Sequence, residues 1–108
     1  MSTVKATIDA GVCGFVTEVM ACCEDGQHVS FEIATPCEKV QKLAGALPTV
    51  DAFAEIGSGF DGQVMTAVRS CFQGCCSGCA VPVGVFKAMQ VAAKLALPKA
   101  VTMSFERL

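Results

Sequence analysis

The order of sequence patterns along this chain predicts an α+β fold. Three segments that alternate apolar and polar side chains come first, three segments with helical spacing follow, and one alternating segment comes last. We therefore expect a two-layer sandwich in element order βββαααβ. An antiparallel sheet of about four strands would carry helices on one face, and residues 1–108 would form a single cysteine-rich α+β domain.

The first three predicted elements are strands. Residues 4–10 alternate strictly, which is typical of a half-buried strand. After a glycine-containing break, residues 15–23 form the second strand, and apolar side chains on both of its faces indicate a central position in the sheet. Asp25-Gly26 is a hairpin turn signal, and residues 28–34 form the third strand.

A helix start follows the third strand directly. Thr35 is suited to the N-cap, Pro36 to the first helical position, and Glu38 to the third position, where it completes a capping box. Apolar side chains then recur at helical spacing as far as Leu47. Pro48 ends this first predicted helix.

The second half of the chain contains the other predicted helices. Residues 49–56 fit either a short helix or an extended segment. Asp61 is the expected cap of a second helix that includes residues 64–71, and residues 82–96 form a third helix. Alternation over residues 101–106 predicts a final strand.

Composition and charge exclude several classes of function. Apolar residues make up 53% of the chain, charged residues make up 17%, and the net charge is −2 with no run of Lys or Arg. This pattern argues against a general nucleic-acid surface and against an anionic-membrane surface. The alternating, charged N-terminus is not a signal peptide, and no uncharged apolar stretch approaches the roughly 18 residues that span a bilayer. We expect a cytoplasmic protein with reduced thiols.

The chain has eight cysteines, and its topology brings some of them together. Cys13 follows the first predicted strand and Cys37 follows the third. In an up-down-up meander, these two strand ends lie at the same edge of the sheet. Cys22 and Cys23 end the second strand, so they fall at the opposite edge.

The cysteines at the first edge predict a metal site. Cys37 and Cys79 lie near predicted helix N-termini, where a thiolate is stabilised. Together with Cys13 and one of Cys71 or Cys75, they could hold an iron–sulfur cluster or zinc. The ligands are scattered and flanked by glycines, which favours the iron–sulfur cluster. Its role would be electron transfer, sensing or accessory assembly.

Two other functions fit the same residues. The first is a thiol–disulfide or sulfur-relay protein that uses Cys76 with Cys79, or Cys37 with Cys79. The second is a non-catalytic interaction module whose thiols mostly serve packing; Cys71, for example, occupies an inward helical position. In that module a second copy of the chain or a protein partner would cover the open face of the sheet.

The sequence offers little basis for an enzyme. The only histidine, His28, lies on the polar face of a strand, at the opposite edge from Cys37 and Cys79. The glycines form no phosphate-binding pattern. Hydrolase, kinase and dehydrogenase activities therefore have no residues to support them, and the roles of Cys22, Cys23, Cys76 and His28 stay open.

The chain resembles a family of small, uncharacterised, cysteine-rich proteins of anaerobic prokaryotes. The resemblance covers nearly the whole chain, and the residues that carry it are Gly11-Val-Cys13-Gly-Phe15, Cys37, Val50-Asp51-Ala-Phe53, Cys79-Ala-Val-Pro82-Val-Gly84 and Leu97-Pro98. It implies a reduced cytosol and a cysteine-based site at Cys13, Cys37 and Cys79. It implies no activity.

Overall fold

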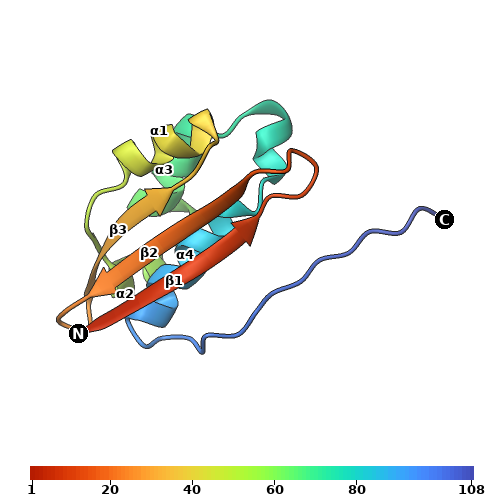
Figure 1. Ribbon diagram of the computed structural model, residues 1–108. Helices are drawn as coiled ribbons and strands as arrows, with labels where there is room; N and C mark the ends of the chain where they lie inside the picture. The colour runs from red at the N-terminus through yellow and green to blue at the C-terminus, as the bar shows by residue number, and fades with distance from the viewer.

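A computed structural model describes all residues, 1–108, and confirms the α+β class (Figure 1). Its sheet has three long strands and one short one, in the spatial order β1-β2-β3-β4, and each neighbouring pair is antiparallel. The strands are β1 (Ser2–Asp9), β2 (Val16–Cys23), β3 (His28–Ala34) and β4 (Val50–Asp51).

The helices cover one face of this sheet, as Figure 1 shows. Helix α4 packs against β1 and β2, while α1 packs against β3 and beside α3. The helices are α1 (Glu38–Ala46), α2 (Ala52–Ser58), α3 (Gln63–Cys71) and α4 (Val81–Ala92), with short 3-10 turns η1 (Gly59–Asp61) and η2 (Gly74–Gly78).

Alternation along the strands separates the core from the outer face. On β2, Val19 and Ala21 are fully buried in the core cluster, which also contains Leu43 of α1 and Met89 of α4. The outer face is mostly polar, and Val16 and Met20 are its large apolar side chains, both partly exposed. A partner on this open face was expected from the two-sided hydrophobicity of β2, and that expectation stays a prediction. Polar or charged side chains on the outer face include Thr3, Lys5, Thr7, Asp9, Glu18, His28, Ser30 and Glu32.

A glycine sets the distance between α4 and β1. A Cβ at Gly84 would overlap Ile8 Cδ1 and would lie 2.6 Å from Ile8 Cγ1. Only a residue without a side chain lets the helix approach β1 this closely. Because Ile8 stands near the end of β1, this contact also fixes where α4 begins relative to the loop after that strand.

The start of α1 differs from the capping box expected at Thr35. The helix begins at Glu38 and its N-cap is Cys37. Thr35 Oγ1 is 2.8 Å from the hydroxyl of the buried Thr17 on β2, and it accepts a hydrogen bond from Cys37 N at 3.2 Å. The link to β2 holds Thr35 before the helix, so the predicted N-cap at Thr35 was wrong.

Two acidic side chains cap the next helices. Residues 49–56 divide into β4 and the first part of α2, and Asp51 at the junction accepts hydrogen bonds from Phe53 N and Ala54 N. Glu55, only 3% exposed, accepts hydrogen bonds from Gln63 N and Val64 N at the start of α3. The expected cap at Asp61 was therefore wrong, because a buried glutamate from the preceding helix supplies the acceptor.

The predicted end of the chain was also wrong in two respects. Helix α4 ends at Ala92 rather than at residue 96, because Lys94 adopts a positive φ of 62° and Leu95 N donates back to Gln90 O. Residues 101–106 alternate as a strand does, but they form no strand and are exposed. The short strand β4 pairs with β3 and supplies the fourth strand instead.

One segment, Gly74–Ala92, is long and apolar enough to cross a membrane by length and composition alone. In the structure it is two helices, η2 and α4, separated at Cys79 and Ala80. Half of the twelve residues of α4 are buried in the domain. The α4 part packs against β1 and β2, whereas η2 has no buried residue.

We predict that Gly84→Ala destabilises the fold. The added Cβ overlaps Ile8, and overpacking of this kind costs about 1–3 kcal/mol, which exceeds the gain in helix propensity. Urea unfolding followed by circular dichroism measures the change in the free energy of unfolding.

Gly45→Ala is the matched control, because Gly45 lies in α1 and nothing stands within 4 Å of its would-be Cβ. This variant should keep or raise the free energy of unfolding, by up to about 1 kcal/mol. Equal effects of the two substitutions would show that the close approach of α4 to β1 is not a constraint on the fold.

Candidate functional site

The register of the sheet separates the cysteines into two groups. Asp9 at the end of β1 pairs with Val16, so the loop that holds Cys13 projects from that end of the sheet. β3 ends beside the same part of β2, and Cys37 follows it. Figure 1 shows this loop and the start of α1 at the end of the sheet away from the N-terminus.

The opposite end of the sheet holds the other pair. Cys22 and Cys23 pair with Thr3 and Ser2. Cys23 is buried in the core, and Cys22 lies on the outer face within 3.7 Å of Thr3 Oγ1. These two thiols are a strand length away from Cys13.

Cys79 is the centre of the first group. Partial burial raises the pKa of its thiol, a hydrogen bond from Val81 N lowers it, and repulsion from the Cys13, Cys76 and Cys37 thiolates raises it, so that the pKa lies above its usual value. The Cys13, Cys37 and Cys76 thiols are therefore the charged groups that act on Cys79 at this end of the sheet. We call Cys13, Cys37, Cys76 and Cys79 the cysteine cluster.

Local structure explains how two members of the cluster reach it. The turn η2 ends with Cys79 N donating to Cys76 O at 3.1 Å, which folds the Cys76-x-x-Cys79 segment back on itself. Cys79 lies immediately before Ala80, the N-cap of α4. Its Sγ accepts a hydrogen bond from Val81 N at 3.5 Å. The helix start therefore holds this sulfur in place.

Cys13 sits in a tight turn between β1 and β2. Gly11 and Gly14 both have positive φ, 88° and 74°, and Gly14 N donates to Gly11 O at 2.8 Å. Gly11 N also donates to the Asp9 carboxylate at 2.9 Å. Cys13 itself is exposed, so its thiol is the most accessible of the cluster.

Cys71 and Cys75 are placed differently. Cys71 is the last residue of α3, packs against the core, and lies 3.6 Å from the Ser70 hydroxyl. Cys75 is exposed in η2. Sequence reasoning assigned one of these as the fourth ligand and assigned Cys76 only to the relay. The C-x-x-C spacing of Cys76 and Cys79 was the signal that could have placed Cys76 in the cluster.

All eight cysteines are free thiols. In the structure as it stands, no three cysteine, histidine or acidic side chains are close enough together to hold one metal ion. The cluster is therefore a neighbourhood of thiols rather than a formed coordination site. Any metal would have to draw these sulfurs closer together.

The helix starts at the cluster differ from those elsewhere. The N-caps of α1 and α4, Cys37 and Ala80, provide no side-chain hydrogen bond to their helices. By contrast, Asp51 and Glu55 satisfy the starts of α2 and α3. The uncapped starts leave partial positive charge near the cluster, which favours a negatively charged group there.

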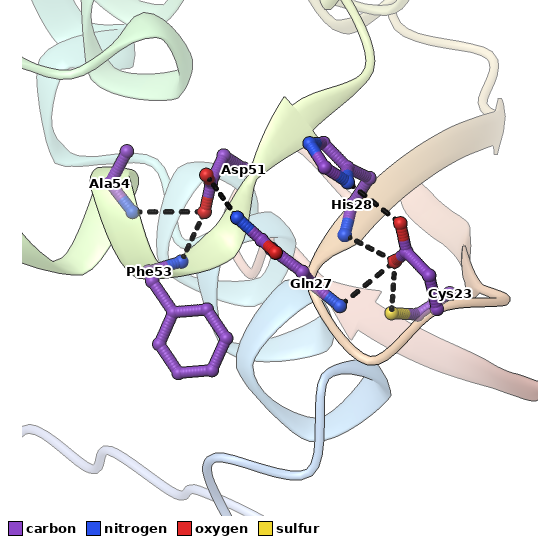
Figure 2. A network of polar contacts seen from close by, with 7 residues as sticks. Cys23, Gln27, His28, Asp51, Phe53 and Ala54 are labelled. Atoms are coloured by element: carbon purple, nitrogen blue, oxygen red, sulfur yellow. Dashed lines mark hydrogen bonds and ion pairs between the residues drawn. The ribbon is translucent and has the colours of Figure 1, made fainter.

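A polar network occupies the β2–β3 turn at the other end of the sheet (Figure 2). The Asp25 carboxylate accepts hydrogen bonds from Gln27 N at 2.9 Å and His28 N at 2.7 Å, and it lies 2.7 Å from His28 Nδ1. Gln27 Nε2 donates to Asp51, which joins this turn to α2. His28 is thus part of a structural turn at the far end from the cysteine cluster, where it cannot act as a base on Cys37 or Cys79.

These contacts shift the pKa values of the network. Hydrogen bonds from His28 N, the His28 ring and Gln27 N hold the pKa of Asp25 far below its usual value. The hydrogen bond with Asp25, aided by the charges of Asp25 and Asp51, raises the pKa of His28 above 6.5. Hydrogen bonds from Gln27 and Ala54 lower the pKa of Asp51.

The fold and the site together define a class: a small α+β domain that gathers four free thiols at one end of its sheet. The chain belongs to the family of unknown function DUF6951, whose model matches residues 4–105. No curated protein and no solved structure matches the chain. The match confirms one part of the expected resemblance, namely that the chain belongs to an uncharacterised family.

We predict that His28, the only histidine, titrates above pH 6.5 in the folded protein, because Asp25 stabilises its charged form. The interaction of charged His28 with Asp25 stabilises the folded state fully below pH 6.5, and this stabilisation is lost as the pH rises through the folded-state pKa of His28. A proton NMR titration of the ring measures this pKa directly. Asp25→Asn should lower it, and an unchanged value would show that the carboxylate does not hold the imidazolium.

Proposed function

We propose that the cysteine cluster binds an iron–sulfur cluster or zinc, and that the protein serves electron transfer, sensing or accessory assembly. The observation that carries this proposal is that the Cys13 loop, the start of α1 at Cys37 and the Cys76-x-x-Cys79 turn all lie at one end of the sheet. Repulsion from the other three thiolates, together with partial burial, disfavours the ionised state of Cys79 when no cation is present. A metal centre would reverse this effect and stabilise four thiolates together.

The surroundings of the cluster fit such a group. Cys79 is partly buried and accepts a backbone hydrogen bond from Val81 N, as metal-bound thiolates commonly do. The uncapped start of α1 at Cys37 adds partial positive charge. These features suit the net negative charge of an iron–sulfur cluster, so we place this ligand before zinc.

Binding would require the Cys13 loop to close. Cys13 is exposed in its turn, whereas Cys37, Cys76 and Cys79 pack against the core. The mobile partner in forming the site is therefore the loop between β1 and β2. When bound, an iron–sulfur cluster would supply one-electron chemistry, and zinc would supply a structural cross-link between this loop and the helices.

The sulfur relay is the competing proposal, and it would use Cys76 with Cys79 or Cys37 with Cys79. The cluster contains both pairs. A relay needs an attacking thiolate, however, and partial burial raises the pKa of Cys79 and keeps it protonated. Metal binding needs the same thiolate, but a bound cation would itself stabilise it, so we place metal binding before thiol exchange as the role of Cys79.

The cellular setting belongs to the same proposal. We infer a reduced cytoplasm of an anaerobic prokaryote and a cysteine-rich family, as the sequence resemblance implies. The acidic net charge of −2 supports a protein without a nucleic-acid or membrane partner.

We predict that anaerobically purified protein contains metal. An iron–sulfur cluster would give broad visible absorption with iron and acid-labile sulfide, and zinc would give a colourless protein with about one metal per chain. Cys79→Ser should abolish the metal, since its thiol stands at the centre of the group. Cys22→Ser at the far end of the sheet should retain it. A wild-type protein without iron or zinc by elemental analysis would refute the proposal.

We also predict which thiol is the fourth ligand. Cys76→Ser should lower the metal content as strongly as Cys37→Ser, because Cys76 adjoins Cys79. Cys71→Ser and Cys75→Ser should leave it unchanged, and elemental analysis of the purified variants provides the comparison. The reverse pattern would assign the fourth position to Cys71 or Cys75, as the sequence alone suggested.

A further inference from the structure

Two features of the chain have no partner within the domain. One is the outer edge of β1, which is hydrogen-bonded only to β2 and therefore ends the sheet. The other is the tail, residues 99–108, which Figure 1 shows leaving the domain as an extended chain. The tail has the alternating pattern and the length of a strand that could pair with the β1 edge. Both have backbone groups that still need hydrogen-bond partners.

The free edge of β1 offers a regular set of backbone groups. Ala10 N donates to Phe15 O, so Ala10 is a hydrogen-bonded partner in the antiparallel ladder. Partners alternate along such a ladder, which directs the backbone of every second residue away from β2. The outward N–H and C=O groups are those of Thr3, Lys5, Thr7 and Asp9. β1 has eight residues without proline, so nothing in it blocks the addition of a strand.

The core is also less covered along this edge. On β1, Val4, Ala6 and Ile8 are only partly buried, whereas Val19 on β2 is fully buried. Val83 on α4, one residue from Gly84 where the helix touches Ile8, is 48% exposed. An additional strand beside β1 would cover these side chains if its inward positions were apolar.

The tail has this pattern. Val101, Met103 and Phe105 are 57%, 67% and 93% exposed, and Thr102, Ser104 and Glu106 alternate with them. A strand with this alternation buries one face and exposes the other. The family model matches the chain as far as residue 105, so most of the tail lies within the matched region.

We propose that residues 100–106 of one copy pair with the β1 edge of a second copy, so that two chains exchange tails. Val101, Met103 and Phe105 would then extend the buried face of the partner's sheet. Reciprocal exchange closes a two-fold symmetric dimer, in which each tail satisfies one edge and no strand edge of β1 is left open. This inference is independent of the metal proposal.

The direction of the tail favours a second copy over the chain's own edge. Ser2 and Lys94 line the same small cavity of about 140 Å³, so the tail leaves the domain at the beginning of β1. A direct path along its own β1 would make it a parallel strand. A second copy can supply the tail antiparallel, and antiparallel pairing is more stable per residue.

The test is the mass in solution, measured by size-exclusion chromatography with light scattering at micromolar concentrations. We expect about twice the chain mass of 11.2 kDa for the wild type. Met103→Asp puts a charge on the apolar side of the tail and should give the monomer mass. Ser104→Asp, on the other side of the same segment, is the matched control and should remain a dimer. Both positions are exposed in the single chain, so neither substitution affects folding of the domain.

Hydrogen exchange locates the interface. In the wild type, the amides of Thr3, Lys5, Thr7 and Asp9 should be protected, and Met103→Asp should lose this protection. A wild type that stays monomeric would overturn the proposal, whether or not its tail is protected on its own domain. So would a dimer that persists in Met103→Asp, because its interface would lie elsewhere.

Discussion

The close approach of α4 to β1 at Gly84 is the constraint on which the rest of the structure depends. Because Gly84 has no side chain, the helix lies against Ile8 near the end of β1. Cys79 stands five residues before Gly84, and Cys13 stands five residues after Ile8. This contact between the α4 backbone and the Ile8 side chain brings together two segments that are far apart in the sequence, and with them Cys13 and Cys79.

The helix starts at the two ends of the sheet differ in how side chains accept hydrogen bonds from their free backbone N–H groups. Asp51 and Glu55 provide acceptors for α2 and α3, and Glu55 does so from within the core. The N-cap residues of α1 and α4, Cys37 and Ala80, accept no hydrogen bond with their own side chains, and both helix starts lie at the cysteine cluster. The one side-chain acceptor at these two starts is the Cys79 sulfur, which accepts a hydrogen bond from Val81 N.

Much of this arrangement could be predicted from local sequence. Strict alternation identified β1 and β3, and strand order placed Cys13 and Cys37 at one end of the sheet. The errors came from contacts distant in sequence. Thr35 failed as a cap because Thr17 on another strand holds its hydroxyl, and α3 is capped by Glu55 rather than by Asp61.

The candidate site was harder to predict than the fold for the same reason. Whether Cys71, Cys75 or Cys76 adjoins Cys79 depends on how one short 3-10 turn folds, and no periodic pattern encodes that turn. The segment 101–106 shows a further limit of pattern analysis. Alternation indicates that a segment suits a sheet, but it does not indicate whether a strand edge is within reach.

The burial of Cys23 has a practical consequence. Its side chain is 2% exposed beneath the sheet, while the remaining seven thiols are exposed or partly so. A bulky alkylating reagent can reach that sulfur only when the end of β2 opens. Its rate of modification, read peptide by peptide in a mass spectrometer, therefore reports how often this end of the sheet opens under native conditions.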